Sequence, residues 1–336
     1  RDLLRAAIDF DICHPRQRHA FAGLATQGQI ADQIDPVALG FLQTHEDIET
    51  LDAVENLADG LSAHAKRQRI EQRIDRNAVA CQCGTIMRIV RWPGGCFADE
   101  YHWREGIGAP SKRKVKINTN WGGVTEDNAV GTHEFMNYSE MLGAEPYVSG
   151  NVGNGTPSEM AEWVEYMTSP TGSSLAKERA ANGRKTPWAL PMFGIGNELW
   201  GCGGNMRPEY AADITRRYGT FLKMPEGQKV MKIASGANAE DYNWTEVMMR
   251  DAGRHFDGIG VHYYTIPYDW KHKGAATGFD EDQWARTLAK TVKMEELIAK
   301  HAAVMDKHDP QKRVALLVDE WGTWYDQEPG SHPGFL

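Results

Sequence analysis

Two glutamates stand where a carboxylate could take part in catalysis. Glu198 follows the apolar segment 193–196, and Glu320 follows the apolar run 314–318. A single glutamate at the end of a strand is most simply a solvated or salt-bridged loop residue. Two such glutamates, each close to a tryptophan, favour a different interpretation, because retaining cleavage of a glycosidic bond uses two carboxyl groups about 5–5.5 Å apart. One of them protonates the leaving oxygen, and the other attacks the anomeric carbon.

Two nearby residues fit the same chemistry. The amide of Asn197 can donate a hydrogen bond to a sugar hydroxyl, and such a bond strengthens in the transition state. Tyr264 lies just past the apolar segment 258–262, where its phenol could keep the carboxylate of Glu320 ionised and oriented. Taken alone, Tyr264 is more often a buried aromatic residue at the end of a barrel strand.

These residues need a scaffold that brings distant strand ends together. After residue 87, short apolar runs flanked by glycine alternate with helical segments, which predicts a parallel sheet covered by helices. The predicted strands are 88–92, 144–149, 193–196, 232–236, 258–262 and 314–318. The predicted helices are 130–142, 157–167, 207–223, 243–251 and 281–307.

The position of the polar residues distinguishes a closed barrel from an open doubly wound sheet. Each predicted strand is followed by a polar or aromatic residue, as on the catalytic face of a (β/α)8 barrel. These residues are Cys96, Asn151, Glu198, Asn238, Tyr264 and Glu320. The loop 150–155 is rich in glycine, but its spacing does not fit a dinucleotide-binding fingerprint. The sequence therefore predicts an α/β fold of the (β/α)8 type.

The first part of the chain has a different character. Residues 1–87 are poor in aromatic residues, and 44–76 has the periodicity of a helix without any alternation of strands and helices. We therefore divide the chain into an unassigned, mostly helical segment, 1–87, and a partial catalytic barrel, 88–336.

Composition excludes several classes of partner. A net charge of -9 leaves no excess of basic residues to neutralise phosphates, so nucleic acid is not expected. No apolar run approaches the roughly 20 residues of a membrane span, so no membrane partner is expected. Eleven tryptophans are compatible equally with core packing and with stacking on sugar rings.

The cysteines and histidines do not predict a cofactor or metal. The five cysteines are an odd number without a regular framework, which favours a reducing, cytoplasmic compartment. Cys81 and Cys83 lack a second pair at the spacing of a zinc site. The histidines His255, His262 and His272 are scattered, and His262 is most simply a hydrogen-bonding residue at a barrel end.

Five motifs in the second part of the chain resemble the α-L-arabinofuranosidases of glycoside hydrolase family 51. They are Arg-Trp-Pro-Gly-Gly-Cys-Phe-Ala-Asp at 91–99, Asn-Thr-Asn-Trp-Gly-Gly at 118–123, Gly-Asn-Glu at 196–198 with Trp-Gly-Cys-Gly-Gly at 200–204, His-Tyr-Tyr-Thr at 262–265 and Asp-Glu-Trp-Gly-Thr-Trp-Tyr at 319–325. The resemblance runs from Arg88 to Leu336, about three quarters of the chain.

The resemblance implies roles for individual residues. Glu198 matches the acid/base and Glu320 matches the nucleophile of a retaining double displacement. The substrate-binding positions that it implies are Cys96, Trp121, Asn197, Tyr264 and Trp324. For Cys96 the simpler interpretation is a small buried thiol. The implied partner is an arabinofuranosyl-containing oligosaccharide or polysaccharide, and members of the family commonly form homo-oligomers.

The resemblance is incomplete at both ends. The family's first barrel strand is not recognisable in residues 1–87, and its eighth strand and C-terminal β-sandwich are not recognisable after Glu320. We therefore expect an incomplete barrel and an incomplete or miscalled gene product. Two other interpretations are a different glycosidase of the same barrel, such as a xylanase or β-glycosidase, and a truncated remnant or sugar-binding protein without turnover.

Overall fold

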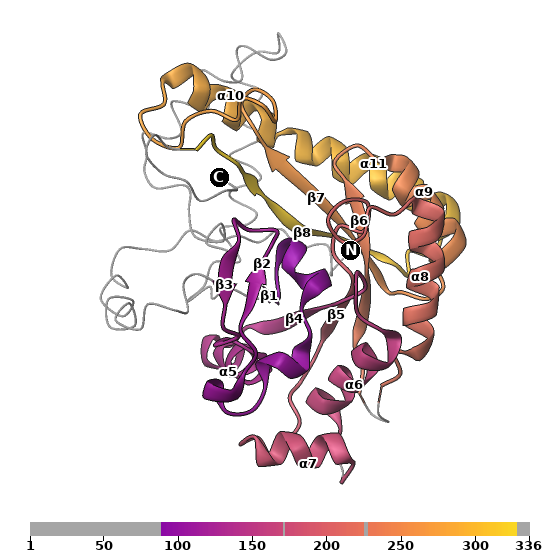
Figure 1. Cartoon of the computed structure of the whole chain (residues 1–336). Helices are drawn as coiled ribbons and strands as arrows, with labels where there is room; N and C mark the ends of the chain where they lie inside the picture. The colour runs from indigo at the N-terminus through magenta and orange to yellow at the C-terminus, as the bar shows by residue number, and fades with distance from the viewer. Residues whose placement is uncertain (1–88, 171, 225–227, 328–336) are drawn as a thin grey trace.

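Six parallel strands form the main sheet of the computed structural model, which describes residues 89–170, 172–224 and 228–327. The predicted helix at 44–76, the segment 1–87 and Cys13, Cys81 and Cys83 lie outside the described residues. All six predicted strands are confirmed, in the order β1-β4-β5-β6-β7-β8 (Figure 1). Their bounds are β1 (Ile89–Trp92), β4 (Glu145–Gly150), β5 (Met192–Ile195), β6 (Met231–Asn238), β7 (Gly258–Thr265) and β8 (Ala315–Thr323).

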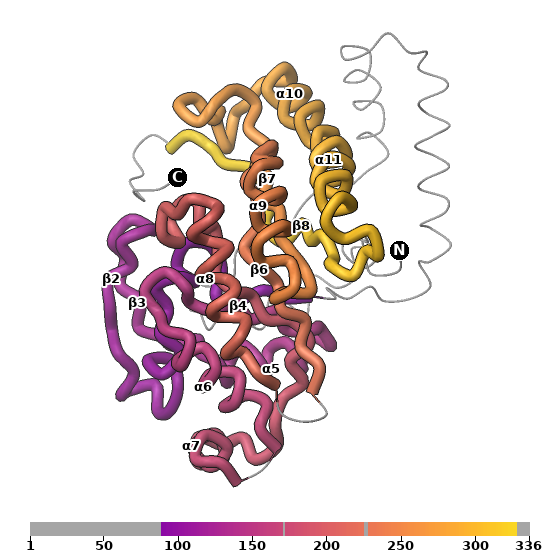
Figure 2. The backbone as a smooth tube through the Cα atoms, turned by 90° about the vertical axis from the view of Figure 1, so that its right-hand side faces the viewer, coloured from indigo at the N-terminus to yellow at the C-terminus, as the bar shows by residue number. Residues whose placement is uncertain are grey.

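Helices connect the strands and cover the outer face of the sheet. In Figure 1, α8, α9 and α11 lie beside β6, β7 and β8, and Figure 2 views the molecule from the side of these helices. The α-helices are α5 (Thr132–Leu142), α6 (Pro157–Thr168), α7 (Ser174–Ala181), α8 (Pro208–Phe221), α9 (Tyr242–Ala252), α10 (Glu281–Thr291) and α11 (Lys293–His308). The 3-10 helices are η3 (Gly95–Glu100), η4 (Trp103–Gly106) and η5 (Pro110–Lys112).

Side chains on the two faces of the sheet belong to two separate clusters. The large cluster joins outward-facing strand residues such as Val148, Phe193 and Ile259 to the helices. The small cluster joins Tyr147, Met192 and Ile233 on the other face. Alternation of side chains along each strand produces this division.

The sheet curves into an open barrel. Arg91 on β1 and Tyr147 on β4 form hydrogen bonds to Glu320 and Asp319 on β8, at the opposite edge of the sheet. Such contacts require the inner face to be concave. The expected incomplete (β/α)8 barrel is therefore confirmed, with the described β1 and β8 at its edges.

Some boundaries differ from the prediction. The predicted helix 281–307 is two helices, α10 and α11, separated at Val292, whose side chain is 68% exposed. The helical pattern that we assigned to one helix therefore belongs to two.

Two strands and one α-helix, as well as the three 3-10 helices, were not predicted. The hairpin of β2 (Lys116–Asn118) and β3 (Val124–Glu126) has strands too short for a periodicity, and α7 buries few apolar side chains. None of the described helices is long and apolar enough to span a membrane.

Candidate active site

A β-bulge turns two consecutive acidic residues of β8 into the barrel. Val261 pairs with Val318 and His262 pairs with Glu320, so Asp319 is the extra residue of β8. In a regular strand, side chains alternate between the faces, and only one of the two carboxylates would face inward. Here Asp319 and Glu320 both reach inward-facing groups of other strands.

Glu320 is surrounded by hydrogen-bond donors. Tyr264 donates its phenolic proton to Oε1 at 2.7 Å, and the guanidinium of Arg91 donates to Oε2 at 3.0 Å. Burial would raise the pKa of Glu320, but the positive charges of His262 and Arg91 and the bond from Tyr264 outweigh it, so the pKa lies below its ordinary value. The carboxylate is therefore ionised near neutral pH, as a nucleophile must be.

Glu198 sits in a tight turn immediately after β5. Its own φ is +45°, which is uncommon for a residue with a side chain, and the preceding Gly196 has a φ of +79°. The carbonyl of Glu198 accepts from the amide of Gly201 at 2.7 Å, and the amide of Leu199 donates to the hydroxyl of Ser235 at 3.2 Å. These bonds fix the strained backbone and direct the side chain toward β7 and β8.

The two glutamates meet across the carboxyl end of the barrel. A carboxylate oxygen of Glu198 and one of Glu320 lie within 4.8 Å of each other. Their side chains are 13% and 10% exposed, so both remain within reach of solvent and ligand. This separation is close to that of retaining glycosidases, and it is shorter than the roughly 6.5–9.5 Å of inverting enzymes.

His262 lies between the two glutamates. Its Nδ1 is 2.9 Å from Oε1 of Glu198 and 3.7 Å from Oε2 of Glu320, and its Nε2 is 3.4 Å from Asp319. Burial would lower the pKa of His262, but the charge of Glu320, the close carboxylate of Asp319 and the hydrogen bond to Glu198 raise it to about 10. The imidazole is therefore positively charged near neutral pH. The expectation of a hydrogen-bonding residue at the barrel end is confirmed.

The side-chain amide of Asn197, beside Glu198, uses its oxygen but not its nitrogen in hydrogen bonds to the described residues. Its oxygen accepts from the guanidinium of Arg91, which also donates to Ser149 at 3.1 Å and to Glu320. Its Nδ2 is buried and has no partner among the described residues. A buried donor without a partner is costly, so this group is well suited to bind a polar ligand.

Asp99 anchors the loops that carry these residues. Its buried carboxylate accepts from the backbone amides of Val152, Gly153 and Asn197 at 2.6 to 2.9 Å. Gly203 also packs directly against it, because a Cβ at that position would lie 2.6 Å from Oδ2. Burial raises the pKa of Asp99 to about 7, although its amide donors oppose that shift.

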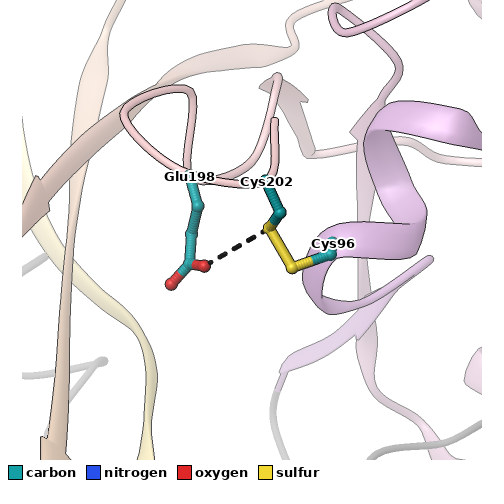
Figure 3. Close-up of side chains that lie close together, drawn as sticks. All are labelled: Cys96, Glu198 and Cys202. Atoms are coloured by element: carbon teal, nitrogen blue, oxygen red, sulfur yellow. Dashed lines mark hydrogen bonds between the residues drawn. A yellow bond between two sulfur atoms is a disulfide. The ribbon is translucent and has the colours of Figure 1, made fainter. Parts of the chain in front are cut away.

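Cys96 is not the free thiol that we expected. It forms a disulfide with Cys202, which joins the segment after β1 to the loop that carries Glu198 (Figure 3). Sγ of Cys202 lies 3.6 Å from Oε2 of Glu198. Because a disulfide sulfur carries no proton, this contact is a hydrogen bond only when a protonated Glu198 is the donor. Cys96 nevertheless lies beside Glu198, and its role in substrate binding stays a prediction.

Four aromatic side chains gather beside Glu320. Trp121 and Trp324 stack with their centroids 5.6 Å apart, and Tyr264 meets Trp324 edge to face at 5.8 Å. Trp270, which the sequence did not single out, is 6.4 Å from both Tyr264 and Trp324 and is 61% exposed. One exposed and two half-buried indoles next to Tyr264, the donor to Glu320, form a surface that can stack on sugar rings.

The predicted site residues therefore largely come together, but two other strand-end residues do not join them. Asn151 bonds to Asn154 and Gly155 in its own loop and to the carbonyl of Tyr101, and Asn238 is exposed at the end of β6.

Three charged residues of the site were missed as site residues. Arg91 places a charge within the otherwise apolar strand β1, and this unusual position is visible in the sequence. Asp319 and Asp99 lacked such a signal, since a regular strand would turn Asp319 away from Glu320, and Asp99 acts only through backbone amides.

One cluster has the spacing of a cation site. Ligand atoms of Glu198, His262 and Glu320 lie within 4.8 Å of one another. However, Arg91 and the protonated His262 already supply two positive charges to these carboxylates. An additional cation would be repelled, and we assign no metal to this cluster.

Comparison with known proteins points to one family. The family model for the "Alpha-L-arabinofuranosidase 1 domain" matches residues 86–283. An intracellular exo-α-L-arabinofuranosidase of Bacteroides ovatus is 54% identical over 248 residues, which cover 74% of this chain and 48% of that relative. An intracellular exo-α-(1→5)-L-arabinofuranosidase of Bifidobacterium longum is 30% identical and covers 71% of this chain and 43% of its own length.

A solved structure supports the same grouping. The crystal structure of the family 51 arabinofuranosidase from Xanthomonas axonopodis pv. citri matches with a TM-score of 0.72 and 61% sequence identity. The match covers 74% of this chain and 50% of that one. The chain thus spans about half the length of the relatives that it matches.

Proposed function

The chain belongs to the α-L-arabinofuranosidases of glycoside hydrolase family 51, and from that membership we propose that it hydrolyses terminal non-reducing α-L-arabinofuranosyl residues with retention of configuration. One observation carries the mechanism. Carboxylate oxygens of Glu198 and Glu320 lie within 4.8 Å of each other. That spacing suits direct attack by one carboxylate and leaves no room for a water molecule between the carboxylate and the sugar, as an inverting enzyme requires.

Glu320 is the nucleophile of this mechanism. Arg91, Tyr264 and His262 stabilise its ionised form, so it can attack C1 of the arabinofuranosyl ring. Glu198 gives its proton to the glycosidic oxygen as the C1–O bond breaks. Water then attacks C1 of the arabinofuranosyl ester and loses a proton to Glu198, which restores both glutamates.

The surrounding residues bind the sugar. The free Nδ2 of Asn197 donates to a ring hydroxyl, and the disulfide of Cys96 forms a wall beside Glu198. Tyr264 orients the nucleophile. Trp121 and Trp324 stack on the part of the substrate that leaves.

The substrates are arabino-oligosaccharides or arabinose-decorated polysaccharides. The exo-acting and (1→5)-specific names of the relatives from Bacteroides ovatus and Bifidobacterium longum support cleavage at chain ends. Both relatives are named as intracellular enzymes, which supports a cytoplasmic location for this chain. Assembly into a homo-oligomer stays a prediction from the family resemblance.

The test is hydrolysis of 4-nitrophenyl α-L-arabinofuranoside by the full chain and its Glu198→Ala and Glu320→Ala variants. Both variants should lose activity, and general acid–base catalysis alone contributes about 10²- to 10⁴-fold. The matched control is Glu209→Ala, on the exposed first turn of α8, which should retain activity.

Azide distinguishes the two roles. Glu198→Ala with azide should give the α-arabinofuranosyl azide, since azide attacks the ester from the side opposite Glu320. Glu320→Ala should give the β-azide, since azide replaces the nucleophile. A folded chain without turnover, or a preference for xylosides or glucosides in a panel of nitrophenyl glycosides, would overturn the proposal.

A further inference from the structure

A buried chain of three ionisable groups links β8 to the acid/base. We propose that Asp319 is a positioning residue that acts through His262 to determine which oxygen of Glu198 carries the transferable proton. This inference rests on the proposed glycosidase mechanism. It assigns a role to a carboxylate that neither bonds the substrate nor attacks it.

Asp319 is held in one position by its surroundings. Its Oδ2 accepts from the phenol of Tyr147 at 2.9 Å, and its Oδ1 faces Nε2 of His262 at 3.4 Å. Its carboxylate lies directly over Gly260, where a Cβ would come within 2.4 Å of Oδ1. The side chain is 7% exposed. Glycine at 260 and the bulge in β8 therefore both serve to seat this carboxylate.

Asp319 is ionised in this position. Burial would raise its pKa, but His262, Arg91 and Tyr147 together hold the pKa below its ordinary value. The charged carboxylate of Asp319, close to Nε2 of His262, keeps that nitrogen protonated. His262 then uses its other nitrogen, Nδ1, to donate to Oε1 of Glu198 at 2.9 Å.

The bond from His262 distinguishes the two oxygens of Glu198. Oε1 accepts from Nδ1–H, so the acidic proton of Glu198 must reside on Oε2. Oε2 is the oxygen that lies 3.6 Å from Sγ of Cys202, on the side of the disulfide wall. The proton is thereby directed to one edge of the carboxyl group before the substrate arrives.

Charge balance gives the same result. The ionisable groups that face this chain are Arg91, Tyr147, Glu198, His262, Tyr264 and Glu320. With Glu198 protonated, the charges of Arg91 and His262 balance those of Asp319 and Glu320. After the first step, Glu198 has given its proton to the departing oxygen and Glu320 is an ester, so the cluster is again neutral. Asp319 keeps its negative charge in both states, and without it the cluster would carry a net positive charge before and after the first step. A buried cluster is more stable when its charges balance.

The first test uses leaving groups of different acidity. Aryl α-L-arabinofuranosides of 2,4-dinitrophenol need little protonation, whereas those of phenol need a full proton transfer. Asp319→Asn should lower kcat/KM about 10²-fold on the phenyl substrate and only a few-fold on the dinitrophenyl substrate.

Two further variants separate this role from a structural one. Asp309→Asn makes the same change of charge at the C-terminal cap of α11, before β8, where Asp309 accepts from the amide of Val314, and should leave the leaving-group dependence unchanged. Gly260→Ala should reproduce the selective loss, because the added Cβ displaces the carboxylate of Asp319 without removing a charge. An equal loss on both substrates in Asp319→Asn would overturn the proposal.

The second test needs no turnover. In the ¹⁵N-histidine-labelled full chain, with His262 assigned by comparison with His262→Gln, the imidazolium should persist above pH 8 and titrate at a lower pH in Asp319→Asn and Gly260→Ala. A neutral His262 at pH 7 in the unaltered chain would overturn the inference. If the chain cleaves no arabinofuranoside but His262 behaves as expected, the proposed function fails, whereas the effect of Asp319 on the protonation of His262 stands.

Discussion

The hydrogen bond from Tyr264 stabilises the ionised form of the Glu320 carboxylate. The phenol donates to Oε1 at 2.7 Å, while Arg91 occupies the other oxygen. A hydrogen bond to a charged acceptor contributes about 1.5–3 kcal/mol. Its loss would raise the pKa of Glu320 and leave one oxygen without a donor.

We therefore predict that Tyr264→Phe lowers kcat/KM roughly 10- to 100-fold, which corresponds to that energy. The acidic limb of the pH profile should move to higher pH, since the nucleophile must be ionised and its pKa rises. Tyr263→Phe is the matched control, because its phenol donates to the carbonyl of Lys290, outside the site. An acidic limb that does not move in Tyr264→Phe would contradict this role.

At this scale the sequence identified the two glutamates and the bond between Tyr264 and Glu320, but not the charged neighbours of these residues. Glu198, Glu320, Asn197 and Tyr264 were all predicted, and the structure brings them together. The pairing of Asp319 with His262 was not predictable, because it depends on a bulge that only strand pairing produces.

Two loops, the one after β1 and the one after β5, are joined twice. Asp99 accepts from the amide of Asn197, and Cys96 forms a disulfide with Cys202 across a sequence separation of 106 residues. Both connections hold the turn in which Glu198 has its positive φ. Glu198 is therefore positioned by a neighbouring loop as well as by its own strand.

We predict that reduction of this disulfide destabilises the protein by roughly 2–4 kcal/mol and lowers turnover on substrates that need proton donation. Cys202 is exposed, so a reductant can reach it. The measurement is Tm and kcat with and without dithiothreitol. The Cys96→Ser/Cys202→Ser double variant should already be destabilised and should not respond further. A response of the double variant would instead implicate Cys13, Cys81 or Cys83.

The disulfide also bears on the expected compartment. The odd number of cysteines favoured a reducing environment, and two relatives carry intracellular names. A bridge beside the acid/base is uncommon for a cytoplasmic protein. The reductant experiment therefore also reports which redox state supports activity.

For the molecule as a whole, the buried charges join the two edges of the sheet. Arg91 on β1 and Tyr147 on β4 reach the acidic residues of β8, with His262 between them. These contacts close the inner face of the described sheet without a hydrogen-bonded ladder between β1 and β8. Stability should consequently depend on the protonation state of this cluster.

The direction of that dependence follows from the pKa shifts. Asp319 and Glu320 have lowered pKa values, so their contribution to stability is present above their ordinary values of 3.8 and 4.5 and is lost as the pH falls. His262 has a raised pKa, so its contribution is complete below 6.5 and is lost as the pH rises to about 10. Asp99, raised from 3.8 to about 7, likewise loses its contribution as the pH rises through 7.

We therefore predict that Tm is highest at about pH 4.5 and falls as the pH rises to 9, first through the contribution of Asp99 and then also through that of His262. Thermal melts across this range check the prediction. His262→Gln should have a lower maximum and a shallower decline on the alkaline side. A Tm that is constant or rising from pH 6.5 to 9 in the unaltered chain would contradict it.

The sequence by itself determined the alternation of strands and helices, the two glutamates and the family. These features are local, since apolar runs, glycines and short motifs such as Gly-Asn-Glu can be recognised without knowledge of the fold. Only the tertiary structure decided how the strand ends meet. The bulge that turns Asp319 inward, the three amides on Asp99 and the bond between Cys96 and Cys202 all join residues that are distant in the chain. Their partners are selected by the curvature and register of the sheet, which no single segment encodes.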